Sequence, residues 1–410
     1  MIYFILFLIE IAILAYSDMK RWKALITPLN VMILPNTVAV IIAVIYSYSN
    51  KHVPNFYFPS LVVWMAGMGL FALPSIYFSS LCRRDNFNVR KGRWDDSYKF
   101  LCVIATICIL ISLYKLRSLS DTLDTYGTDE FSDEYQVSGI FAHLSVLLCA
   151  IFAYSVYKFD KHHLYTIFII IGALIGMYAI GTKSWIIAPL LIGYYGRLLT
   201  GKTKFSVKTV ILPVLLIFAI FFMSYFLILV MASTAELSPE FYEYLGEHFI
   251  NYLSGANLAF SLDYQRGIVE PEMADALIAP FLNIINMFTK EPYVNVINPV
   301  HWHLGDMGYN NVRTVFGAFL CYSHSIVIFV MISLSYSILT HTIYLMSRYS
   351  KSLFLLLANC TCLTFLTYSF FDFTWVNLTP YELLVLFLLM HIILHGVKDK
   401  RIIATPIVGA

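Results

Sequence analysis

The stretch TVILPVLLIFAIFFMSYFLILVMA, residues 209–232, carries no charged side chain over its 24 positions. An α-helix of about 20 apolar residues crosses the hydrocarbon core of a bilayer, so this run predicts a membrane span. Of all 410 residues, 59% are hydrophobic and only 13% are charged. Because a soluble domain is about 25% charged, this composition excludes a soluble enzyme, a disordered chain and a disulfide-stapled secreted domain.

Similar apolar runs recur along the chain and predict an all-α polytopic membrane protein with about eleven transmembrane helices. The first run has no basic segment before it and no small-residue cleavage site after it, so we expect a span there and not a signal peptide. The predicted spans are residues 2–17, 30–49, 58–81, 99–116, 138–157, 164–181, 183–200, 208–232, 314–339, 352–371 and 379–396.

These spans divide the chain into residues 1–231 with eight helices, a large loop at 232–313, and residues 314–410 with three helices. The loop is far longer than a connection requires and is not of low complexity, which favours a functional segment. Two short amphipathic helices are expected in it, one opened by Ser238-Pro239-Glu240 and one by Glu270-Pro271-Glu272. Each is expected either to lie on the membrane surface or to pack on the helix bundle.

Lysine and arginine are distributed unevenly between alternate loops, and one set of loops holds most of the 27 basic residues. The positive-inside rule places that set in the cytoplasm. The N-terminus and the 232–313 loop are then expected outside the cytoplasm, and the C-terminus inside.

Several functions are disfavoured because their motifs are missing. The sequence contains no phosphate-binding P-loop, no GxSxG, no HExxH and no dinucleotide-binding glycine pattern. None of its seven cysteines has the spacing of a metal site, and a net charge of +2 gives no reason to expect nucleic acid. We therefore expect no metal, no cofactor and no nucleic-acid partner.

Few ionisable residues lie in the middle of the predicted spans, and the candidates are Glu10, His143, His324 and Glu382. Each is near a predicted helix end or is expected to be able to face another helix, whereas a transporter places such groups along its path. The polar side chains gather in the 232–313 loop. This distribution favours a reaction at the outer membrane face over passage through the bundle.

Three cations on the outer side are candidates to bind phosphate: Arg266 and Arg313 in the large loop, and Lys183 in a tight turn between two spans. An arginine fork forms paired charge-assisted hydrogen bonds with a phosphate, and a lysine supplies a compact charge. The alternative for each cation is an ion pair with an acid of the loop.

The segment around His301, Trp302, His303, Asp306 and Tyr309 is rich in groups that contact sugars. A histidine titrates near neutral pH, so His303, His301 or Asp306 is a candidate general base toward a hydroxyl. Metal binding by the two histidines and Asp306 is the less favoured alternative. Trp302 and Tyr309 are expected to stack on sugar rings, although aromatic residues are also ordinary at a membrane interface.

Three short motifs resemble a known family. They are Gly181-Thr-Lys-Ser184 opening a span, Asn251-Tyr-Leu-Ser-Gly255 in the loop and Asn311-Val-Arg-Thr-Val-Phe-Gly317 leading into the next span. In order and placement they resemble the bacterial O-antigen or oligosaccharide repeat-unit polymerases of the Wzy type, as does the whole arrangement of spans and loop.

The resemblance implies a multi-pass glycosyltransferase of the bacterial inner membrane that takes part in O-antigen or capsule-type polysaccharide biosynthesis. Its substrate is a glycan linked to undecaprenyl diphosphate, transferred at the periplasmic face to a new lipid-linked unit. The partners implied are that glycan, membrane lipid and a chain-length regulator protein. The loop arginines of the family correspond to Arg266 and Arg313, and its turn cation to Lys183. An O-antigen ligase and a lipid-linked glycan flippase or other transporter are the alternatives.

Overall fold

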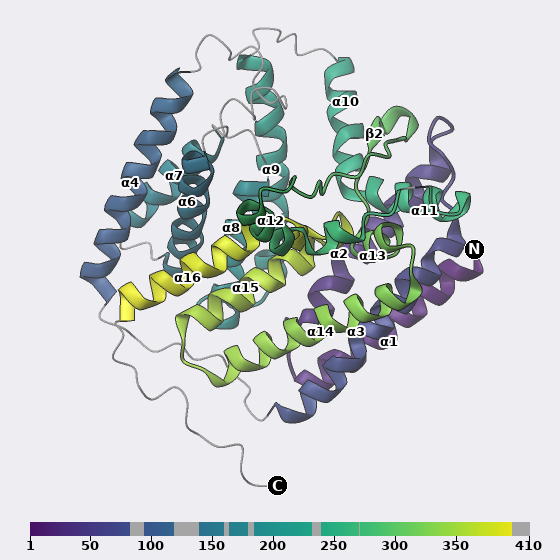
Figure 1. The fold of residues 1–410 in the computed structure, drawn as a ribbon, viewed down its shortest axis with the longest axis horizontal. Helices are drawn as coiled ribbons and strands as arrows, with labels where there is room; N and C mark the ends of the chain where they lie inside the picture. The colour runs from purple at the N-terminus through teal and green to yellow at the C-terminus, as the bar shows by residue number, and fades with distance from the viewer. Residues whose placement is uncertain are drawn as a thin grey trace. The chain divides into compact units, whose positions relative to one another are not determined.

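The computed structural model describes residues 1–82, 94–118, 139–159, 164–178, 184–231, 239–269 and 271–395. Most of them are helical (Figure 1). Among the described residues, eight helices are long and apolar enough to cross a membrane. The expected all-α polytopic class is thereby confirmed. The count of eleven stays a prediction, because residues 166–178, 186–199 and 379–394 form shorter apolar helices.

Eleven helices of this part correspond to the eleven predicted runs. They are α1 (Ile2–Trp22), α2 (Pro28–Ser49), α3 (Leu61–Leu81), α4 (Trp94–Ser118), α6 (Gly139–Lys158), α7 (Leu164–Tyr178), α8 (Ser184–Leu199), α9 (Val207–Met231), α14 (Ile326–Tyr349), α15 (Leu353–Thr367) and α16 (Thr379–His395).

The chain divides into two compact units. The first consists of Met1–Asp85, Glu236–Leu345 and Cys362–Pro380, and the second of Asn86–Ala235, Met346–Thr361 and Tyr381–Ala410. Described by itself, the second unit is organised around α6, which packs closely on α8, α4 and α7. A side chain at Gly193 of α8 would lie 2.5 Å from the Ala153 carbonyl oxygen of α6, so glycine allows this close approach.

In the first unit a buried polar cluster joins the first three helices. The Asp18 carboxylate of α1 accepts hydrogen bonds from the hydroxyls of Thr27 and Ser75, and Trp22 donates its indole N–H to Ser75 Oγ at 2.7 Å. Thr27 is also the N-cap of α2, accepting the amide of Asn30. Polar groups within a bilayer require internal partners, so the cluster fixes the α1–α2 turn against α3.

The predicted span at 314–339 is wrong in its bounds, because two helices occupy this part of the chain. Helix α13 (Val315–Ser323) ends where His324 adopts a left-handed conformation (φ 49°), with its amide bonded to the Leu320 carbonyl oxygen at 2.9 Å. Helix α14 then begins at Ile326. The polar residues Ser323-His324-Ser325 lie at this break, and the apolar residues on both sides of them made one continuous span the prediction.

The first loop helix begins at Pro239, as predicted, but is much longer than expected. Helix α10 (Pro239–Ile250) continues through a π-helical turn (Asn251–Gly255) into α11 (Ala256–Arg266), which ends at Gly267 with φ 83°. Eight successive residues of α11 are buried. The α11 part of the helix therefore packs on the protein, against α2 and the short turn Phe58–Ser60, whereas Leu245 is the one buried residue of α10.

The second loop helix begins later than predicted. A short turn at Ala274–Ile278 leads into α12 (Ala279–Thr289), whereas the preceding Met273 donates its amide to the Tyr322 carbonyl oxygen of α13 at 2.8 Å. Residues 271–273 are therefore not a first helical turn, and Met273 joins this segment to α13.

The remainder of the loop forms a small hairpin, whose strands are β1 (Trp302–His303) and β2 (Tyr309–Asn310). Trp302 pairs with Asn310 and His303 with Tyr309, and a 3₁₀ turn (Gly305–Met307) connects them. This hairpin carries four of the sequence-predicted site residues, and His301 directly precedes it, so its attachment decides where they lie.

Candidate functional site

The side chain of Asn251 attaches the hairpin to the long loop helix formed by α10 and α11. Its Nδ2 donates to the carbonyl oxygens of Met307 (2.8 Å) and Tyr309 (3.1 Å), and its Oδ1 accepts from Asn310 Nδ2 at 2.8 Å. Asn251 is the first residue of the π-helical turn. Such turns widen a helix locally and are frequent at functional sites.

Gly255 makes room for this amide pair. A Cβ atom at position 255 would lie 1.9 Å from Asn251 Oδ1 and 2.7 Å from Asn310 Nδ2. Both atoms take part in the bond that holds the hairpin, so neither moves without weakening it. The Asn251-Tyr-Leu-Ser-Gly255 motif therefore has a structural explanation.

Gly255→Ala is expected to lower the stability of the protein by about 1–3 kcal/mol, because it displaces buried hydrogen-bonded amides. Gly246→Ala is the matched control in the same helix, since a Cβ at Gly246 meets nothing within 4 Å. That change is expected to be neutral or to stabilise by about 0.5–1 kcal/mol. Thermal unfolding of both variants in detergent measures the difference, and equal behaviour would contradict the assigned role.

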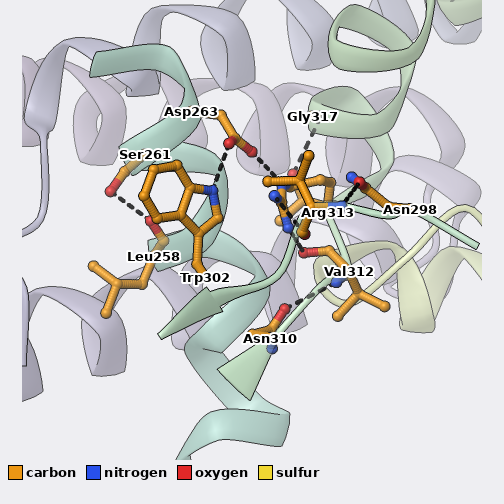
Figure 2. Close-up of polar contacts among 11 residues, drawn as sticks. Leu258, Ser261, Asp263, Asn298, Trp302, Asn310, Val312, Arg313 and Gly317 are labelled. Atoms are coloured by element: carbon orange, nitrogen blue, oxygen red, sulfur yellow. Dashed lines mark hydrogen bonds and ion pairs between the residues drawn. The ribbon is translucent and has the colours of Figure 1, made fainter. Parts of the chain in front are cut away.

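A buried ion pair lies behind the hairpin. Arg313 and Asp263 are both fully buried, and their side chains are hydrogen-bonded to each other. Figure 2 shows the Asp263 carboxylate between this guanidinium and the indole of Trp302, which donates its N–H at 2.5 Å. Arg313 also donates to the carbonyl oxygens of Val312 (3.0 Å) and Val300 (3.4 Å).

This pairing changes the interpretation of Arg313. The sequence suggested that it binds phosphate directly, but in the structure its charge is balanced by Asp263 and its side chain has no exposed surface. The alternative, an ion pair with an acid of the loop, is what the structure contains. Arg313 therefore positions α11 and the hairpin relative to the start of α13.

Arg266 is different, because its side chain is exposed. Its guanidinium carbon lies 4.3 Å from the ring centroid of Trp302, in cation–π contact. The edge of the Trp302 indole is bonded to Asp263 while its face carries Arg266. The structure thus brings Arg266, Trp302 and Arg313 together and leaves Arg266 as the accessible cation. Lys183 lies outside the described residues.

Removal of one partner of the buried pair is expected to destabilise the protein strongly. Asp263→Ala leaves a buried guanidinium without its counter-charge, and such changes typically lower stability by about 3–5 kcal/mol. Arg266→Ala, which removes only an exposed cation–π contact, is expected to change stability by no more than about 1 kcal/mol. Thermal unfolding and yield from the membrane distinguish the two, and a mild effect of Asp263→Ala would contradict the role given to the pair.

The other predicted residues lie on the exposed surface of the hairpin segment. His301, His303, Asp306 and Tyr309 are exposed, and the His303 ring centroid is 4.8 Å from that of Tyr309. Asp306 accepts a hydrogen bond from Asn50 Nδ2 at 3.0 Å. His303 is therefore available to a ligand from solvent, whereas Asp306 also attaches the hairpin tip to the end of α2.

The hairpin tip lies on the chain between α2 and α3. Gly305 has φ 65°, and a Cβ there would be 1.8 Å from the His52 carbonyl oxygen, so only glycine fits. Near the tip, burial together with the carboxylates of Asp306 and Glu243 raises the pKa of Glu247. Among the described residues, no group of three or more His, Cys, Asp or Glu side chains is placed to hold a metal ion.

Asp372 is a residue that the sequence did not single out. It lies between the turns Tyr368–Phe370 and Thr374–Val376, and its carboxylate accepts the amide of Phe373 at 2.7 Å. Burial raises the pKa of Asp372 to about 6, although that hydrogen bond and the positive charge of Arg313 act to lower it. Raised carboxyl pKa values are frequent at functional sites.

Two buried amides hold the segment that carries Asp372. Asn36 Nδ2 of α2 donates to Ser369 Oγ at 2.8 Å, and Asn257 Nδ2 of α11 donates to the Phe370 carbonyl oxygen at 3.3 Å. In sequence, Asp372 is one acid between two apolar runs. Its proximity to Arg313 depends on long-range packing, so no local signal could have identified it.

The pH dependence of stability tests the environment of Asp372. Its pKa is raised from 3.8 to about 6 on folding, so its favourable contribution is complete below about pH 4 and is lost as the pH rises through 6. Asp372→Asn cannot ionise, and is expected to gain about 1–2 kcal/mol relative to wild type between pH 4.5 and 7.5, allowing for solvent screening. Melting temperatures at both pH values measure this change. A constant difference between the two proteins would show that the carboxyl titrates normally.

The sequence model of a protein family described as a family of unknown function, DUF6337, matches residues 52–400. No curated protein and no solved structure is significantly similar to the chain. The matched range includes the long loop helix, the hairpin and the segment with Asp372. The candidate site therefore lies within the part of the chain that defines the family.

Proposed function

The chain belongs to the DUF6337 family, and we propose that it polymerises oligosaccharide repeat units carried on undecaprenyl diphosphate. In this proposal a growing glycan is transferred from its carrier to a new lipid-linked unit, at the periplasmic face of the bacterial inner membrane. The product is an O-antigen or capsule-type polysaccharide. The polytopic helical fold supports a substrate that is itself anchored in lipid.

The observation that carries the proposal is the exposed Arg266 on the face of Trp302. A guanidinium is suited to a diphosphate because it offers paired charge-assisted hydrogen bonds. Trp302 is held by Asp263 at its edge, so the cation rests on a fixed platform. Preorganised positive charge of this kind stabilises a diphosphate leaving group as its charge develops.

In the proposed reaction, a sugar hydroxyl of the acceptor unit attacks the anomeric carbon of the donor glycan. A new glycosidic C–O bond forms, and the C–O bond to the diphosphate breaks with its electron pair passing to the diphosphate oxygen. The hydroxyl proton passes to His303, which is exposed on the same hairpin as Trp302. His301 and Asp306 are the other candidate bases, and Tyr309 beside His303 is a stacking surface for a sugar.

Deletion of the gene tests the class of function. A polymerase defect is expected to leave single repeat units on the surface glycan. Loss of a ligase, the first alternative, would leave full-length chains on the carrier. Loss of a flippase or other transporter would leave the lipid-linked unit on the cytoplasmic leaflet. Intact long chains would exclude the proposal.

Arg266→Ala is expected to abolish chain extension in the complemented deletion strain, at unchanged levels of protein in the membrane. Arg266→Lys is expected to restore it only in part, since an ammonium lacks the planar fork. Lys290→Gln is the control, because it removes an exposed cation of the same loop that lies outside the site. Gel profiles of the surface glycan measure the outcome, and long ladders from Arg266→Ala would remove the basis for diphosphate binding there.

A further inference from the structure

Helix α12 has a polar side whose partners are within its own loop. The side-chain amide of Asn283 bonds to the backbone of Val294 in both directions, accepting at 2.7 Å and donating at 3.4 Å. Asn286 Nδ2 donates to the Pro292 carbonyl oxygen at 2.8 Å. The chain that follows the helix, at Pro292 and Val294, therefore covers this side of the helix.

The other side of α12 is apolar and exposed. The exposed fractions are 54% for Phe281, 55% for Ile285 and 77% for Phe288, and Ile284 and Met287 are exposed beside them. Five large hydrophobic side chains on an 11-residue helix form a patch of the kind that marks a membrane or protein contact. A helix that exposes such a face to water is not expected to be stable by itself.

The attachment of α12 indicates what covers this patch. Met273, just before the turn that leads into α12, is bonded to Tyr322 at the end of α13. Four residues later α14 begins, a candidate membrane span whose first residues Ile326 and Val327 are 75% and 67% exposed. The chain just before α12 is therefore held near the beginning of α14. The first residues of α14 also expose apolar side chains.

We infer that α12 is an interfacial helix whose Phe281, Ile285 and Phe288 face lies in the membrane leaflet at the Ile326 end of α14. Its amphipathic pattern, with the polar side already bonded, fits a helix lying in the plane of the interface. Lys290 follows directly after the helix, in position for its ammonium group to reach the headgroups. The inference does not depend on the proposed enzymatic function.

Spin labels at single cysteines test this placement in the full-length protein. Of the seven cysteines, all in described parts of the chain, only Cys82 and Cys102 are not buried, so replacing these two by serine gives a background in which the others are shielded. Labels are placed by Phe288→Cys and Ile285→Cys. Glu291→Cys, an exposed position three residues beyond Phe288, is the matched control.

In vesicles of phosphatidylethanolamine and phosphatidylglycerol, labels at 285 and 288 are expected to be more accessible to oxygen than to a water-soluble nickel chelate. The label at 291 is expected to show the reverse order. If the labels at 285 and 288 behave like the label at 291, the face is in water and the inference fails. It also fails if both labels are shielded from both reagents, because another protein or a second copy then covers the face.

A second measurement is independent of the cysteine background. Phe288→Trp keeps an apolar side chain at the most exposed position of the helix and adds one tryptophan to the six of the native chain. Brominated lipid is expected to quench the added fluorescence, whereas tryptophan introduced by Glu291→Trp is expected to be quenched much less. Equal quenching of the two added tryptophans would overturn the placement.

Discussion

The buried ion pair of Arg313 and Asp263 is the interaction on which the loop structure depends. Both side chains are buried. Removing an ion from water costs several kcal/mol of free energy unless the ion is paired and hydrogen-bonded. Here the pair is completed by the indole of Trp302 and by two backbone carbonyl groups. If α11 or the hairpin separated from the start of α13, a charged side chain would therefore lose its buried partner.

The same pair gives the candidate site its electrostatic character. Because Asp263 balances the charge of Arg313, the accessible positive charge on Trp302 is that of Arg266 alone. The indole is fixed at its edge, so the guanidinium above its face loses less conformational freedom when it binds a ligand. Two arginines that look equivalent in sequence thus have different tasks: one positions the site, and the other is available for binding.

The local parts of the fold were predictable from sequence, and the long-range parts were not. The apolar runs predicted the apolar helices, and Ser238-Pro239 predicted the start of α10, because composition and capping act over a few residues. The role of Arg313 depends on an acid 50 positions away. The π-helical turn and the environment of Asp372 likewise depend on packing partners that a single sequence does not identify.

The two loop helices show the same limit in another form. Both have an amphipathic pattern, and that pattern was equally compatible with the membrane surface and with the bundle. Helix α11 packs because Asn251 and Gly255 allow the hairpin to approach closely and because its acid Asp263 has a buried partner. The polar residues Asn283 and Asn286 of α12 are instead bonded to residues 292–294 of its own loop, and its apolar face is exposed. Hydrophobic periodicity indicates that one face of a helix is removed from water. The polar residues beside that face determine whether it contacts protein or lipid.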